Sequence, residues 1–112
     1  MTVWLVSRHP GAGEWVRRQG IRVDRQVEEL DPARVAAGDV VLGTLPLHLA
    51  AAVCERGARF WALSLDVPRE WRGRELSAGD MDRLGARLEE FRVERRPGTR
   101  PEPAAAGEEE GR

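Results

Sequence analysis

The sequence predicts a small α/β domain in which a mostly parallel sheet lies between two layers of helices. Short apolar runs that suit buried strands alternate along the chain with segments whose apolar residues recur at helical spacing. Glycine or proline stands at most of the junctions between them, where helices begin or stop. A length of 112 residues allows one such domain.

The expected elements follow one another in a regular order. They are a strand at 2–6, a helix from Ala12 to Gln19, a strand at 21–25, a short helical turn at 32–38, a strand at 39–43, a helix at 46–56, a strand at 59–65 and a helix from a capping box at 77–80 to about residue 95. The run TVWLV at 2–6 is apolar on both faces, which is typical of a central parallel strand. The helix at 46–56 is apolar nearly all round, so it is either deeply buried or covered by a partner subunit. The last helix would bury Met81, Leu84, Leu88 and Phe91.

The composition divides the chain into a folded part and a tail. Residues 1–95 carry the alternating elements, and residues 96–112 are rich in proline, glycine and glutamate. Such a segment has too few apolar side chains to form a core, so we expect a disordered acidic tail. No internal repeat is present.

Charge and cysteine content limit the classes of partner and compartment. The formal net charge is −1, and all 18 basic residues are arginine. The balance of charge argues against duplex nucleic acid as a partner, whereas arginine forks suit a small phosphate-bearing ligand. The single cysteine, Cys54, allows no internal disulfide, and two histidines with one cysteine show no metal-ligand spacing. The sequence shows no membrane span and no signal peptide, so we expect a cytoplasmic protein with no metal and no cofactor.

The first loop that could carry chemistry spans residues 7–13. It follows the first strand, and ligands of parallel sheets gather at the carboxyl ends of strands. Arg8 offers a fork for phosphate, Ser7 a hydroxyl, and His9 a side chain that exchanges protons near neutral pH. The small residues Gly11 and Ala12 would let a ligand approach open amides at the start of the helix. The alternative is a tight turn with His9 as an ordinary surface residue.

The second loop, at 43–48, follows the strand at 39–43 in the same way. Gly43, Thr44, Leu45 and His48 are its candidate ligand-binding residues. If Pro46 is the first helical residue, the amides of Leu47 and His48 are left open to a ligand. If the helix begins later, Thr44 caps it and the loop is purely structural. The sequence does not decide between these cases.

Three stretches of the chain carry a resemblance to a known family. The run TVWLVSRHPGA, the later VDR at 23–25, and GDVVLGTLP with the helix after it resemble the CRISPR-associated Csx-sixteen family, an accessory of type III systems. The resemblance covers residues 1 to about 95 and excludes the tail. It implies a Rossmann-like fold related to CARF domains and a homodimer. It also implies action on cyclic oligoadenylate, the second messenger of type III immunity.

The resemblance implies a metal-independent ring nuclease that linearises the messenger and ends antiviral signalling. We expect the messenger to be cyclic tetra-adenylate. Carried over onto this sequence, the motif residues are Ser7, Arg8, His9, Gly11, Thr44 and His48. The catalytic candidates are His9 for proton transfer, Arg8 for charge stabilisation and Ser7. One alternative is a sensor or sponge that binds the ring without cutting it. A second is a phosphatase with a histidine nucleophile, although Pro10 stands where that family has glycine and the chain is short for its fold.

Overall fold

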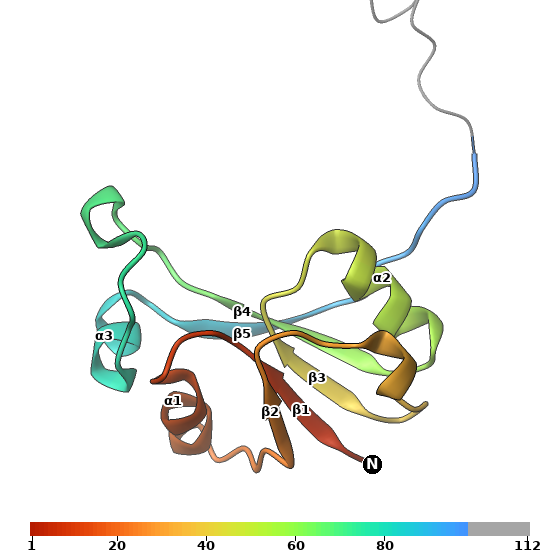
Figure 1. Ribbon diagram of the computed structural model, residues 1–112, viewed down its shortest axis with the longest axis horizontal. Coiled ribbons are helices and arrows are strands. Elements are labelled where there is room, and N and C mark those ends of the chain that lie inside the picture. The colour runs from red at the N-terminus through yellow and green to blue at the C-terminus, as the bar shows by residue number, and fades with distance from the viewer. Residues whose placement is uncertain (99–112) are drawn as a thin grey trace, which may run out of the picture.

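The computed structural model describes residues 1–98, and it has the predicted α/β architecture (Figure 1). Its elements are β1 (Val3–Val6), α1 (Ala12–Arg18), β2 (Arg25–Val27), the 3₁₀ turn η1 (Pro32–Arg34), β3 (Val40–Gly43), α2 (Leu47–Glu55), β4 (Arg59–Ser64), the 3₁₀ turn η2 (Arg69–Trp71), α3 (Ala78–Arg83) and β5 (Arg87–Phe91). Most of the expected tail, from residue 99, lies outside the described residues. No helix within residues 1–98 is long and apolar enough to cross a membrane.

The five strands form one sheet in the order β2-β1-β3-β4-β5. The first four pair in parallel, and β5 pairs antiparallel with β4 at the edge of the sheet. The chain moves outward from β1 in one direction to β2 and in the other to β3. The order of the strands therefore reverses between β1 and β3, and this is the switch point at which doubly wound sheets bind ligands.

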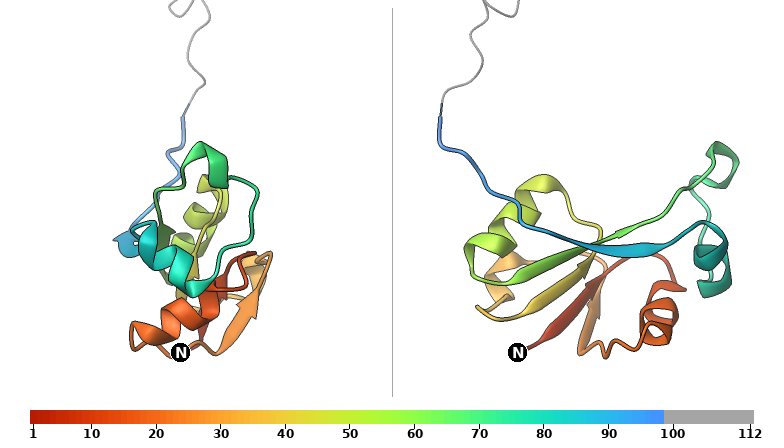
Figure 2. Two further views of the ribbon diagram at one scale, coloured as in Figure 1. Left: turned by 90° about the vertical axis from the view of Figure 1, so that its left-hand side faces the viewer. Right: turned by 180° about the vertical axis from the view of Figure 1, so that it is seen from behind.

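Helices cover the sheet on both faces, as the alternation predicts (Figures 1 and 2). On one face, α2 and η1 pack on a core that includes Trp4, Val41 and Phe60. On the other face, α1 and α3 pack on a core that includes Leu5, Leu42 and Leu63. Successive residues of β1, β3 and β4 thus alternate between the two cores, as the pleat requires.

The strand expected at 21–25 lies later in the chain than predicted. Residues Ile21 and Val23 do pack against the α1–α3 core, which explains their alternation with polar residues. The hydrogen bonds that join this segment to β1 begin at Asp24, whose amide donates to the Val3 carbonyl at 2.8 Å. Strand β2 follows, from Arg25 to Val27. One-sided burial was a correct inference, but its assignment to the strand was wrong by about three residues.

The prediction of a long final helix, running to about residue 95, is also wrong. The capping box is present, with the Ser77 hydroxyl accepting from the Asp80 amide and the Asp80 carboxylate accepting from the Ser77 amide. The helix nevertheless ends at Arg83, and Gly85 adopts a φ of +73°, which reverses the chain into β5. Leu88 then pairs with Leu63 as a strand residue. Met81, Leu84 and Leu88 are three and four residues apart, which is also the spacing of a helix, so the sequence pattern did not reveal this turn.

Helix α2 is less buried than its composition suggests. Ala50, Ala51 and Val53 face the core, whereas Leu47 keeps 76% of its surface exposed. The described chain alone therefore does not cover the apolar start of this helix.

Candidate functional site

A cleft lies at the carboxyl ends of β1, β2 and β3, across the switch point of the sheet. It has two lobes that share Val6, Arg8, Glu28 and Thr44. The polar lobe, of about 230 Å³, adds Ser7 and His9 to the shared residues. The apolar lobe, of about 320 Å³, adds Glu29, Leu30, Leu45, Pro46 and Leu49. The cleft thus brings together side chains from both loops that the sequence singled out.

The first loop presents three polar side chains to the polar lobe. The Ser7 hydroxyl accepts a hydrogen bond from the His9 amide at 3.1 Å, which fixes the turn and sets the imidazole beside the cleft. The Arg8 guanidinium pairs with Glu29 at 3.2 Å. Because these two side chains are 72% and 83% exposed, the pair is weak and an entering anion can compete for Arg8.

Gly11 and Ala12 do not line this cleft. The Gly11 amide donates to the Leu76 carbonyl at 3.0 Å, and the Ala12 amide donates to the His9 carbonyl at 3.1 Å. No side chain caps α1, as expected, but these backbone bonds leave neither amide open. A Cβ on Gly11 would meet the backbone of Ala78 at 2.3 Å. Glycine is needed here for close packing against the segment that leads into α3.

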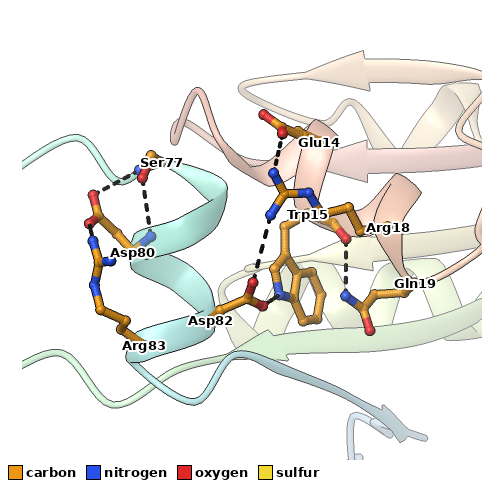
Figure 3. Close-up of polar contacts among 8 residues, drawn as sticks. All are labelled: Glu14, Trp15, Arg18, Gln19, Ser77, Asp80, Asp82 and Arg83. Atoms are coloured by element: carbon orange, nitrogen blue, oxygen red, sulfur yellow. Dashed lines mark hydrogen bonds and ion pairs between the residues drawn. The ribbon is translucent and has the colours of Figure 1, made fainter.

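The network that holds this first loop in place joins α1 to α3 (Figure 3). The Trp15 indole donates to Asp82 at 2.8 Å, and Arg18 bridges Glu14 and Asp82. The capping box at the start of α3 completes the support. The hydrogen bond that Asp80 accepts from the Ser77 amide, together with its contact to Arg83, holds the pKa of Asp80 below its ordinary value. Two short helices thus stabilise each other and fix the backbone of residue 11.

The second loop combines parts of the two cases that the sequence left open. Helix α2 begins at Leu47, and Pro46 at the cap position offers no side-chain hydrogen bond. The Thr44 hydroxyl donates instead to the Leu63 carbonyl at 3.5 Å, so it does not cap the helix. Within residues 1–98, the amides of Leu47 and His48 have no hydrogen-bond partner. Neither case is therefore observed as stated: the helix begins one residue after Pro46, Thr44 does not cap it, and the two amides are open as in the first case.

Gly43 shapes the second loop without contributing a surface to the cleft. Its φ is +135°, and a Cβ would lie 2.0 Å from the Val6 carbonyl oxygen. This close approach lets the Thr44 amide donate to the same carbonyl at 3.3 Å, which brings Thr44 beside the first loop. His48, by contrast, is exposed, and its side chain lines neither lobe.

Sequence reasoning missed Glu28, which lines both lobes. It follows the last residue of β2 directly, and the Ser7 amide donates to the Val27 carbonyl at 3.0 Å, so the ends of β1 and β2 lie together. The rule that ligands gather at the carboxyl ends of parallel strands would also have pointed to the residue after β2. Glu28 was missed because the strand was expected to end at residue 25, two residues before its actual end at Val27.

A cavity larger than either lobe lies elsewhere, on the sheet face that α1 and α3 leave partly open. It measures about 590 Å³, and its walls include Val3, Trp15, Val40 and Trp61. The polar side chains at its rim are already engaged, since Arg87 pairs with Asp66 and Gln19 donates to the Trp15 carbonyl. No group of three or more histidine, cysteine, aspartate or glutamate residues within 1–98 could hold a metal ion. The cleft at the switch point is therefore the better candidate site.

Comparison with protein families agrees with the motifs that flank this cleft. A family model described as "Putative CRISPR-associated protein (Cas_VVA1548)" matches residues 4–94, which include both loops and the whole sheet except Val3, the first residue of β1. The chain belongs to this CRISPR-associated family. No curated protein and no solved structure matches it. Within this CRISPR-associated protein, the matched segment ends just after β5 and leaves out the tail.

The cleft of this CRISPR-associated protein offers a defined set of chemical groups. Arg8 provides a cation, His9 a group that can take or give a proton, and Ser7 and Thr44 provide hydroxyls. The apolar lobe next to them is lined by leucine and proline, surfaces on which a flat ring can pack. The cleft thus places polar side chains and an apolar surface side by side, with Glu28 between the two lobes.

Proposed function

We propose that this protein is a type III CRISPR ring nuclease that binds cyclic oligoadenylate, cyclic tetra-adenylate in particular, and opens the ring to end antiviral signalling. The observation that carries the proposal is the position of Ser7, Arg8, His9 and Thr44 in one cleft at the β1/β3 switch point. Membership in a CRISPR-associated family supports the assignment of the ligand to that immune pathway. The sequence resemblance described above supplies the identity of the messenger.

The two lobes fit the two parts of a nucleotide. The polar lobe, with Arg8 and Thr44, would take a backbone phosphate and its ribose. The apolar lobe, lined by Leu30, Leu45 and Leu49, would take the base that is attached to that ribose. Open amides of Leu47 and His48 at the start of the nine-residue α2 add donors at the same edge of the sheet.

The proposed step is an intramolecular transfer at phosphorus. The ribose 2′-oxygen attacks the adjacent phosphorus, the bond from phosphorus to the 5′-oxygen breaks, and the products are a 2′,3′-cyclic phosphate and a 5′-hydroxyl. His9 takes the proton of the 2′-hydroxyl or gives one to the leaving 5′-oxygen, which is worth about two to four powers of ten. Arg8 stabilises charge on the phosphoryl oxygens. Alignment of the ring supplies much of the remaining acceleration, and no metal ion is required by this step.

A homodimer would suit this ligand. A ring with rotational symmetry can lie on a two-fold axis and meet one copy of the cleft from each subunit. Leu47, 76% exposed at the start of α2 beside the apolar lobe, is an apolar surface that a second subunit could cover.

The test is to incubate the purified full chain with cyclic tetra-adenylate, with and without a chelator, and to follow the product by mass spectrometry. We expect a linear product that ends in a 2′,3′-cyclic phosphate, at the same rate in both samples. An intact ring that nevertheless binds the protein would contradict the ring-nuclease proposal and support the sponge. A protein that neither binds nor cuts the ring would overturn the proposed function altogether.

A further inference from the structure

Two consecutive carboxylates stand at the mouth of the cleft. Glu28 lines both lobes, and Glu29 lines the apolar lobe and pairs with Arg8 at 3.2 Å. The hydrogen bond from the Ser7 amide to the Val27 carbonyl ties the end of β2 to the end of β1. Both carboxylates are therefore held next to the phosphate position of the proposed site.

The charge of the lining is unusual for a site that receives phosphate. Among all residues that line the two lobes, Arg8 is the one cation, and Glu28 and Glu29 are the anions. Counted over Arg8, Glu28 and Glu29, the lining carries one positive and two negative charges, so this sum is negative. A phosphate that enters must compete with Glu29 for Arg8 and must lie within reach of the Glu28 carboxylate.

The number of charges on the ligand decides how large this penalty is. An internal phosphodiester carries one negative charge, which Arg8 can match. A terminal phosphate monoester carries about 1.5 to 2 negative charges at pH 7. The additional charge meets a carboxylate with no second cation to offset it, and two like charges about 4 Å apart repel by about 1 kcal/mol even in water.

We propose that Glu28 and Glu29 form a charge filter that favours internal phosphodiesters over terminal phosphate monoesters. This inference rests on the proposed function, because it assumes that the cleft receives a nucleotide backbone. Its ligand class is an uninterrupted phosphodiester backbone, such as a closed ring or the interior of an oligonucleotide. Mononucleotides that end in a phosphate would bind poorly even though their base fits the apolar lobe.

The experiment compares two small ligands that need no ring chemistry. Adenylyl-(3′→5′)-adenosine carries one internal diester, and adenosine 3′-monophosphate carries one monoester. Each is titrated into the full chain, and the shifts of the backbone amides of residues 7–9 and 44 are followed by NMR at pH 7.5. The comparison protein carries the near-isosteric pair Glu28→Gln and Glu29→Gln. A matched control carries Glu55→Gln and Glu94→Gln, two carboxylates that line a different cavity.

In the wild type we expect the dinucleotide to bind about tenfold more tightly than the monophosphate. In the Glu28→Gln/Glu29→Gln protein this ratio should shrink about fivefold, through a gain in affinity for the monophosphate. The extra adenosine of the dinucleotide contributes equally in both proteins, so the change in the ratio reports the filter alone. The control protein should keep the wild-type ratio.

An unchanged ratio in the Glu28→Gln/Glu29→Gln protein would overturn the filter and leave the proposed function standing. Loss of ring cleavage in the earlier assay, combined with the expected ratios here, would overturn the nuclease and leave the filter standing. If neither ligand shifts any amide of residues 7–9 or 44, the filter is overturned, and the ring assay alone decides the proposed function.

Discussion

The charged side chains at the two ends of the sheet differ in burial and in hydrogen bonding. At the amino end, Asp39 is 4% exposed and accepts hydrogen bonds from the Thr2 amide, the Ala36 amide and the Trp4 indole. At the carboxyl end, Arg8, Glu28 and Glu29 are exposed, and Arg8 makes one weak ion pair. A buried carboxylate whose oxygens are fully used can only hold the fold together. Exposed groups with unused hydrogen-bonding capacity remain available to a ligand.

The same contrast explains the pKa of Asp39. Burial alone would raise it, but the hydrogen bonds from Ala36, Thr2 and Trp4 outweigh burial, so the pKa of Asp39 lies below its ordinary value. The charged form of this group is therefore part of the native structure. The amino end of the sheet is stabilised by this buried charge.

The largest effect is expected at Gly43, whose conformation shapes the carboxyl end. In Gly43→Ala, the new Cβ would lie 2.0 Å from the Val6 carbonyl oxygen, at a φ that other residues rarely adopt. We expect a loss of about 4 kcal/mol in the free energy of unfolding, from overpacking and backbone strain together. Chemical denaturation followed by circular dichroism measures it.

Gly38→Ala separates these two causes. Gly38 also has a positive φ, of +88°, but nothing lies within 4 Å of its Cβ position. It should lose only about 1 kcal/mol. Equal losses in the two variants would show that the close approach of residue 43 to β1 is unimportant.

Removal of the buried carboxylate should be nearly as costly. Asp39→Ala leaves three donors without their acceptor at the amino end, and we expect a loss of about 3 kcal/mol in the free energy of unfolding. Asp24 is the matched control, because its exposed carboxylate accepts one bond, from the Val3 amide, at the same end of the sheet. Asp24→Ala should cost about 1 kcal/mol. Similar costs at the two positions would remove the contrast between buried and exposed carboxylates.

Arg8 should behave in the opposite way, with a large effect on binding and none on stability. Arg8→Ala should weaken the binding of cyclic oligoadenylate about tenfold, since one charge-assisted contact to phosphate is lost. Its melting temperature should stay within about 2 °C of the wild type, because its one ion pair is exposed. Isothermal titration and thermal melting measure the two quantities. Arg22→Ala, at an exposed ion pair with Asp24, is the control that should change neither.

The smallest expected effect is on the pH dependence of the melting temperature, in the variant Asp39→Asn. Because the pKa of Asp39 is lowered in the folded protein, its charge stabilises the fold above the unfolded value of about 3.9. That stabilisation is lost as the pH falls through the folded pKa. In Asp39→Asn one acceptor is already missing, so its melting temperature should lie below that of the wild type at pH 6. The difference should narrow between pH 5 and pH 2, and a constant difference would contradict this role.

Sequence patterns predicted the fold well where only one structure could satisfy them. The runs at β1, β3 and β4 are apolar toward two cores, and a parallel sheet covered on both faces is what such runs require. The region after α3 failed because the spacing of Met81, Leu84 and Leu88 suits a helix as well as the observed turn and strand. Gly85 was the one local sign of the break.

The candidate site was predicted in part, and for a physical reason. Arg8, His9 and Thr44 follow strands whose ends were placed correctly, so the rule for parallel sheets brought them to one edge. Glu28 follows a three-residue edge strand, which has too short a pattern to be placed from sequence. Burial of Gly11 depends on Leu76, 65 residues later in the chain, and no local pattern reports such a contact.

We propose that the ring is cut in the cleft at the switch point, and variants of the two histidines of the chain test this proposal. His9 lines the polar lobe, whereas the side chain of His48 lines neither lobe. The measurement is single-turnover cleavage of cyclic tetra-adenylate by folded His9→Ala and His48→Ala proteins, with ring binding measured in parallel. We expect His9→Ala to cut about a hundredfold more slowly while binding within a few-fold of the wild type, and His48→Ala to cut at the wild-type rate. Wild-type turnover by His9→Ala would contradict the account.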